Sequence, residues 1–250
     1  MRGRGVPLQG LRGRKTYERQ VALVLGLTAH TMETARLVQD LAAREGLSVT
    51  TMPLVRASLE SAVTAVWIAQ VEDAAEAFGH QHAKQEILLF DQFRATGDPT
   101  WTHLLEAMEP RSYDFGATTS HHQAKHFHSR CQDLQGGMTI YALYRALSGW
   151  SHASVRVADE FLLHTNRRDD GNTTFALRPK ASPFEGQDTW MFVSALSALW
   201  ASRAVNYLTR DHARRSLLRR AARELGVPLD LKPSQAPNKR RPRKKGQSGA

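Results

Sequence analysis

The sequence contains very little cysteine, because Cys131 is the single thiol among 250 residues. One thiol cannot form an intramolecular disulfide, which argues against a secreted scaffold and favours a reducing cytoplasmic compartment. Long apolar runs are also missing: Val21–Leu27 and Trp190–Ala201 are the longest, and both fall short of the ~20 residues that span a bilayer. The basic start continues into Gly and Pro rather than into an apolar run, so we expect no signal peptide. A cytoplasmic protein without a membrane segment is predicted.

Acidic residues are scarce at both ends of the chain, which carries a formal net charge of +10. Residues 1–15 contain five basic side chains and no acidic one, and residues 227–250 contain seven against Asp230 alone. The residues between these ends are therefore close to neutral. The Lys/Arg run of the tail predicts either a solubilising segment or a sequence-independent contact with nucleic-acid phosphates, made by Lys239, Arg240, Arg241, Arg243, Lys244 and Lys245.

Apolar residues recur with helical spacing along most of the intervening chain. Between Thr16 and Glu45, Val21 and Leu25 begin one such stripe, and Gly46 supplies a stop. Thr51-Met52-Pro53 is a helix start, with proline in the first turn. Further helical patterns are predicted over residues 54–71, 71–93, 100–108, 121–134, 138–163 and 188–225.

Residues 173–177 alternate weakly and predict a short strand or one arm of a hairpin. Because each apolar helical stripe must be buried against another, we predict an all-α fold, a multi-helix bundle of five to seven helices. The bundle is expected to form a single domain over residues 16–226. A disordered basic arm over residues 1–15 and a disordered basic tail over residues 227–250 would flank it.

Polar residues with helical spacing interrupt two of the apolar helices. Tyr144, Ser148 and His152 fall at i, i+4 and i+8, and Arg56 and Glu60 fall at i and i+4. A charged pair within an apolar run either faces solvent or is buried with partners. We predict that the five residues meet across the bundle. They would form either a ligand-binding site or a polar network that locks the helices together.

The order of these two motifs resembles an uncharacterised bacterial all-helical family, a domain of unknown function with R-x-L-x-E and Y-x-x-L-S-x-x-x-H helices that is loosely HEPN-like. The first motif departs from that pattern by one position, because two residues separate Arg56 from Leu59. The resemblance covers about residues 16–210. It implies a helical bundle and, through HEPN ribonucleases, metal-independent cleavage of RNA in a defence or toxin system.

In HEPN ribonucleases four to six residues separate an Arg from the following His, and Arg145 and His152, with six residues between them, match the longest spacing. The resemblance implies that Arg145 stabilises phosphate charge, that His152 transfers protons, and that two protomers form a homodimer around the site. Ala146 stands where that superfamily has a polar residue after its Arg. The nuclease hypothesis therefore remains an alternative.

Histidines gather at His121, His122, His126 and His128, close to Cys131. His122 and His126 are spaced i, i+4, which allows one helix to bind a metal, but no Glu lies between them as in metalloproteases. A solvated helix face is the alternative interpretation of this cluster. We expect no metal and no other cofactor, with His122 and His126 as the weaker alternative.

Three functions remain open from the sequence. The first is a binding or regulatory module built around Arg56, Glu60, Tyr144, Ser148 and His152. The second is a HEPN-like ribonuclease, in which case the protein would be an enzyme. The third is a nucleic-acid-associated protein that acts through its basic tails.

Overall fold

The computed structural model describes residues 14–107, 118–165, 174–209 and 211–234. Its longer helices are α1 (Arg14–Glu45), α2 (Met52–Gln70), α3 (Ala74–Thr96), α7 (Gly137–Ser151), α9 (Asp188–Thr209) and α10 (His212–Glu224). Shorter elements are η1 (Val49–Thr51), η2 (Pro99–Trp101), α4 (Thr102–Ala107), α5 (His121–Lys125), α6 (Phe127–Gln132), α8 (Val155–Asp159) and the strands β1 (Leu162–Thr165) and β2 (Thr174–Leu177). The predicted all-α bundle is confirmed. None of the described helices combines the length and the apolar character that a membrane crossing requires.

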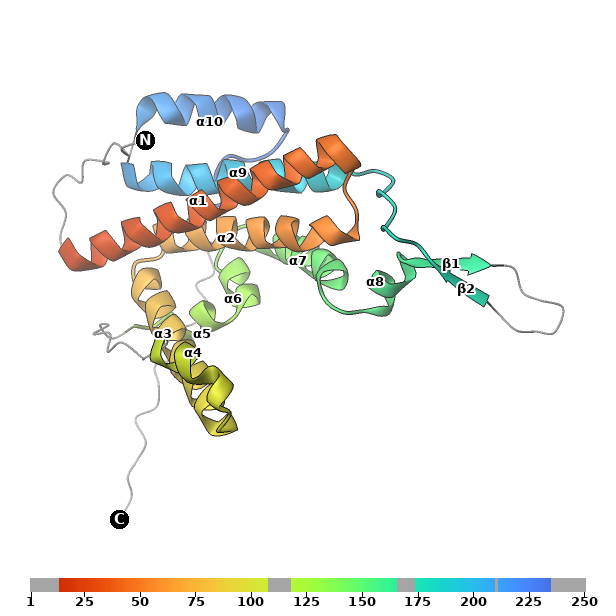
Figure 1. Ribbon diagram of the computed structural model, residues 1–250. Coiled ribbons are helices and arrows are strands. Elements are labelled where there is room, and N and C mark those ends of the chain that lie inside the picture. The colour runs from red at the N-terminus through yellow and green to blue at the C-terminus, as the bar shows by residue number, and fades with distance from the viewer. Residues whose placement is uncertain (1–13, 108–117, 166–173, 210, 235–250) are drawn as a thin grey trace, which may run out of the picture.

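Helix α2 is the centre of the bundle. It runs antiparallel to α1, with α9 and α7 on its other sides (Figure 1). All residues from Ala62 to Ile68 are buried, as expected of a helix that is covered all round. The helix begins at Met52 with Pro53 in its first turn, as the sequence predicts. Because α2 has little contact with solvent, its polar side chains must find partners inside the protein.

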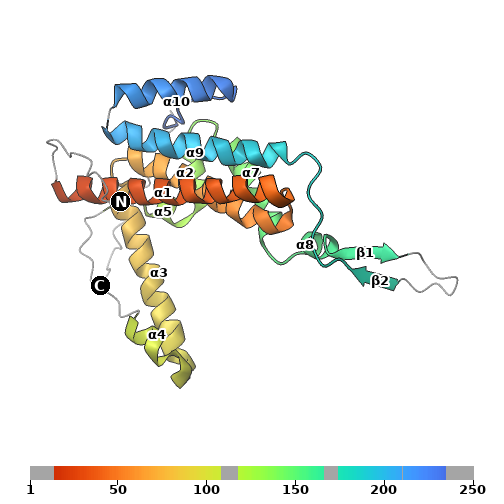
Figure 2. The ribbon, with the colours of Figure 1, turned by 45° about the horizontal axis from the view of Figure 1, so that its top comes forward.

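Two pairs of elements project from opposite ends of the bundle. Helices α3 and α4 extend from one end, and the hairpin of β1 and β2 extends from the other (Figures 1 and 2). In the hairpin, Leu162 pairs with Leu177 and Leu163 with Ala176 in antiparallel register. The strand predicted over residues 173–177 is thus confirmed as β2, whereas its partner β1 overlaps the last two residues of the helix predicted over residues 138–163.

Three predicted helices are interrupted by residues that cap or extend the backbone. The helix expected over residues 138–163 ends at Ser151, because His152 is extended, and Ser154 then caps α8 by accepting from the Val157 amide. His126 is likewise extended and separates α5 from α6. Asp211 starts α10 by accepting a hydrogen bond from the Arg214 amide at 3.1 Å, so the last helix is two helices.

The predicted disordered tail begins too early at residue 227, because residues 227–234 pack against the bundle. Leu231 is buried, and its carbonyl accepts a 2.6 Å hydrogen bond from the Gln70 side chain. The backbone of Gln135 donates to the Lys232 carbonyl at 2.8 Å. Residues 1–13 lie outside the described residues. So do the six residues predicted to contact nucleic acid, Lys239, Arg240, Arg241, Arg243, Lys244 and Lys245.

Asp230 connects residues 227–234 to α9 through hydrogen bonds. Substitution of Asp230 should therefore destabilise the protein in a pH-dependent way. Its Oδ1 accepts hydrogen bonds from Arg203 Nε at 2.6 Å and from the Tyr207 hydroxyl at 3.0 Å. Burial alone would raise the pKa of Asp230, but these bonds and the charges of Arg203 and Arg215 outweigh burial and lower the pKa. We expect Asp230→Asn to lower the free energy of unfolding at neutral pH by about 1 kcal/mol.

The pH profile identifies the carboxylate as the source of this effect. A group whose pKa is lower in the folded state stabilises the fold above its unfolded-state pKa, about 3.9 for Asp, and this stability is lost as pH falls through the folded-state value. In urea unfolding, the difference between wild type and Asp230→Asn should stay constant from about pH 5 to 7 and shrink below about pH 4. A difference that persists at the lowest pH would contradict the assignment.

Candidate functional site

The candidate site is built on one face of α2, where Arg56, Glu60 and Thr64 fall one turn apart. The Thr64 hydroxyl donates to the Glu60 carbonyl at 2.7 Å, which holds its oxygen in place. Ser61 and Ala57 lie on other faces of the helix, so the polar stripe is one residue wide. The stripe faces α6 and α7, both of which pack against α2.

Arg56 meets Tyr144 of α7, as the spacing of the two motifs predicts. The Nη2 atom of Arg56 donates a hydrogen bond to the Tyr144 hydroxyl. Its guanidinium carbon also lies 4.6 Å from the centroid of the same ring, within the range of a cation–π contact. Both side chains are half-buried. The contact therefore fixes Arg56, a residue that keeps part of its surface open to solvent.

Glu60 pairs with Arg130 of α6, a residue that the sequence analysis missed. Arg130 Nη2 lies 3.5 Å from Glu60 Oε1, and Nη1 donates to the Thr64 hydroxyl at 2.9 Å. The Arg130 side chain is only 7% exposed, against 35% for Glu60. Burial lowers the pKa of Arg130, and the Glu60 carboxylate partly offsets this effect. The sequence around Arg130 mixes polar and apolar residues over only six helical positions, so it carried no signal of a buried arginine.

Aromatic rings surround the two guanidinium groups. Arg130 lies over Phe127 and Phe78, with its guanidinium carbon 5.5 and 5.6 Å from the ring centroids. The Phe127 ring is 4.4 Å from Tyr144, measured between centroids. Tyr144 in turn is stacked 6.1 Å from Tyr141. These rings keep water away from Arg130 and give the half-buried Arg56 a planar neighbour.

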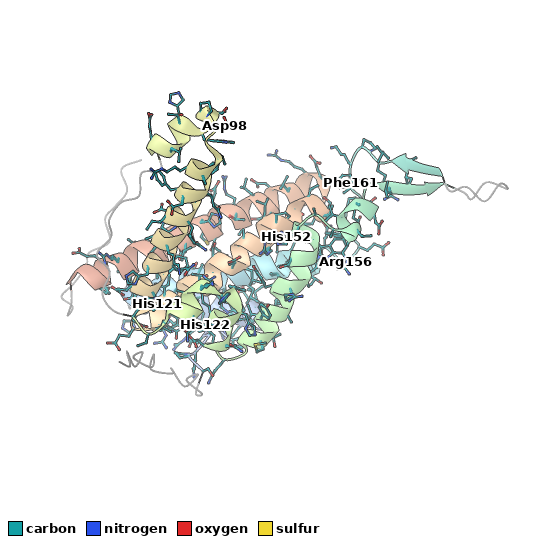
Figure 3. The ribbon with its side chains drawn as sticks, turned by 90° about the horizontal axis from the view of Figure 1, so that it is seen from below. Asp98, His121, His122, His152, Arg156 and Phe161 are labelled. Carbon is teal, nitrogen blue, oxygen red and sulfur yellow. The ribbon has the colours of Figure 1, made fainter. Side chains whose placement is uncertain are left out.

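Three of the predicted site residues do not join this cluster. The Ser148 hydroxyl donates to the Tyr144 carbonyl of its own helix at 2.8 Å. His152 is exposed and lies beyond the last turn of α7, on the side toward α8 (Figure 3). Arg145 is also exposed. The predicted i+8 placement of His152 is wrong, because the helix ends one residue before it.

The electrostatic balance of the cluster favours a negatively charged ligand. Arg56 and Arg130 contribute two guanidinium groups, whereas Glu60 contributes one carboxylate, and Arg130 already contacts it. The Nε atoms of both arginines are buried and have no hydrogen-bond partner among the described residues. Buried charged donors are strongly stabilised when an anion accepts from them.

The histidine cluster does not form a multidentate centre within the described part of the chain, where no group of three or more metal-binding side chains is found. The rings of His122 and His126 are 5.1 Å apart, but His126 follows the last residue of α5, and His122 Nδ1 is 3.0 Å from the Ser129 hydroxyl. Burial raises the pKa of the nearby Cys131 thiol to about 12. That thiol is therefore protonated and unreactive at neutral pH.

Comparison with known proteins gives one result for the region that contains the cluster. A family model described as a family of unknown function (DUF5677) matches residues 21–171, more than half of the chain. This stretch includes Arg56, Glu60, Arg130 and Tyr144 and ends beyond β1. Neither the curated proteins nor the solved structures yielded a match.

Proposed function

Because the chain belongs to this family, whose function is unknown, we propose from the geometry of the cluster that the protein is a binding module for a ligand with an anionic group. Arg56 would hold the anion. Arg130 and Glu60 would form the fixed base of the site. The observation that carries the proposal is the presence of two guanidinium groups for one carboxylate at a partly buried position.

The exposures of the two arginines support different roles for them. Arg130 is almost fully covered and already contacts Glu60 and Thr64. Arg56 is half-buried and is held against Tyr144, so its guanidinium is ordered before a ligand arrives. Such preorganisation lowers the entropy cost of binding. A carboxylate or phosphate accepts well from a guanidinium, because both sides of the contact are charged.

Binding of small anions should depend on Arg56. We expect citrate to bind the wild type in titration calorimetry at constant ionic strength, and Arg56→Gln to weaken that binding by about tenfold or more. Arg36→Gln is the matched control, because Arg36 is an exposed arginine of α1 that is paired with Glu33 at 2.9 Å. Equal weakening by both substitutions would indicate nonspecific charge attraction and would contradict the proposal.

A HEPN-like ribonuclease is the second candidate function, and the exposure of Arg145 and His152 favours it. Both side chains are accessible to a substrate as large as RNA. The deciding measurement is cleavage of a mixed RNA pool in EDTA by wild type, Arg145→Ala and His152→Ala. Cleavage that disappears in both variants while their melting temperatures are unchanged would make the protein an enzyme and replace the binding-module proposal.

A further inference from the structure

A cationic pocket lies between α9 and α10, outside the stretch that the family model matches. Helix α10 lies along the outer side of α9 (Figures 1 and 2). The pocket has a volume of about 310 Å³, and it is lined by Arg203, Asn206, Tyr207, His212 and Arg215. Each of these side chains can donate a hydrogen bond, and none of them is acidic. The pocket is therefore lined by cationic and polar residues from two helices.

The α9 side of this pocket is rigid. Arg203 is 7% exposed, donates from Nε to Asp230 at 2.6 Å and from Nη1 to the Asn206 side chain, and lies 4.2 Å from the centroid of the Tyr207 ring. Asn206 also donates to the Asp211 carbonyl at 2.7 Å, which connects α9 to the start of α10. These contacts hold the guanidinium of Arg203 in one orientation.

Asp230 is hydrogen-bonded to Arg203, whereas its interaction with Arg215 is through charge alone. Its Oδ1 accepts from both Arg203 and the Tyr207 hydroxyl, and its carboxylate charge is thus directed toward α9. Arg215 of α10 keeps its Nε atom buried without a hydrogen-bond partner among the described residues. A buried cationic donor without an acceptor is unfavourable, because the group has lost water and has gained no replacement. Arg215 therefore still needs a negatively charged acceptor in this pocket.

We propose that this pocket binds a phosphate group through Arg215, with Arg203 and His212 as additional donors. A phosphate suits the site better than a single carboxylate, because it offers more acceptor oxygens to cationic residues that come from both α9 and α10. Exposed Arg219 and Arg223 follow Arg215 by one and two turns of α10. Their field raises the local concentration of anions near the pocket.

Inorganic phosphate is the first probe, because its binding needs no further contact. Wild type, Arg215→Gln and Arg219→Gln are compared by melting temperature and by titration calorimetry, with sodium chloride matching the ionic strength. We expect phosphate to raise the melting temperature of the wild type above that in chloride, Arg215→Gln to weaken binding by about tenfold or more, and Arg219→Gln to change it by less than about twofold. Arg219 is the matched control, since it is an exposed arginine of the same helix.

Adenosine monophosphate and a short single-stranded oligonucleotide test whether the pocket binds free phosphate, the phosphate of a nucleotide, or the phosphates of a nucleic acid. Binding of all three probes that is lost in Arg215→Gln would show a pocket that accepts a phosphate group whether it is free or esterified. Binding of the oligonucleotide alone, weakened equally by Arg215→Gln and Arg219→Gln, would show a charged helix surface and overturn the proposal. So would equal melting temperatures in phosphate and chloride. Phosphate binding that is lost in Arg215→Gln belongs to this pocket, whereas binding that is lost in Arg56→Gln belongs to the α2–α6–α7 cluster, so either proposal can fail without the other.

Discussion

Gly137→Ala is expected to lower the free energy of unfolding by about 3 kcal/mol or more. Gly137 is the first residue of α7, and a Cβ atom placed on it would lie 2.6 Å from the carbonyl carbon of Cys131 and closer still to the carbonyl oxygen. The atoms it meets belong to the backbone of α6, so no side chain can rotate away. One of the two helices would have to move.

Gly136→Ala is the matched control for this substitution. Gly136 has φ +72°, which disfavours alanine by about 1–2 kcal/mol, but a Cβ atom there has no other heavy atom within 4 Å. Urea unfolding of the two variants therefore distinguishes the cost of a clash with the backbone of α6 from the cost of a left-handed backbone conformation. If Gly136→Ala were the more destabilised of the two, the close approach of α6 and α7 would not be the limiting constraint.

The close approach at Gly137 also determines the geometry of the candidate site. Arg130 lies on α6, just before this corner, and Tyr144 lies on α7, two turns after it. The contact between the Phe127 and Tyr144 rings spans the same two helices. A displacement of α7 by Gly137→Ala would therefore disturb the cluster around Arg56 as well as the core.

The bundle was predictable from the sequence, because apolar periodicity and caps are local signals. Gly136-Gly137 correctly predicts a break between helices, but only the structure shows that one glycine provides a left-handed residue and the other provides room for a carbonyl. The strand β1 was missed. It overlaps the end of an apolar helical pattern, and its pairing with β2 is a tertiary event.

The candidate site was predictable only where its residues lie on one helix or on two strongly patterned helices. The i, i+4 spacing correctly brought Arg56 to the same side of α2 as Glu60, and the second motif correctly supplied Tyr144. Arg130 comes from a helix of six residues, too short to have a recognisable face. His152 was misplaced because the i+8 relation assumes a helix that continues beyond Ser151.

Arg130→Met is expected to destabilise the protein by about 2–3 kcal/mol, because methionine replaces the stem of the side chain but leaves Glu60 and Thr64 without the guanidinium. Glu60 is 35% exposed, so water can solvate its carboxylate when the Arg130 guanidinium is gone. The free energy of unfolding should therefore fall by less than it would for a fully buried ion pair. Glu60→Gln alone leaves Arg130 with a neutral neighbour. The double variant has no unpaired carboxylate, so its loss of stability should be smaller than the sum of the losses in the two single variants.

A double-mutant cycle on Arg130 and Glu60, measured by urea unfolding, tests whether burial rather than distance sets the strength of this ion pair. We expect a coupling free energy of about 1 kcal/mol or more between them, although their atoms are 3.5 Å apart. The matched cycle uses Arg36 and Glu33, which are closer at 2.9 Å but are 63% and 61% exposed. Solvent screens that surface pair, so its coupling should be clearly smaller. If the exposed pair were the more strongly coupled, Arg130 and Glu60 would not form the fixed base of the cluster.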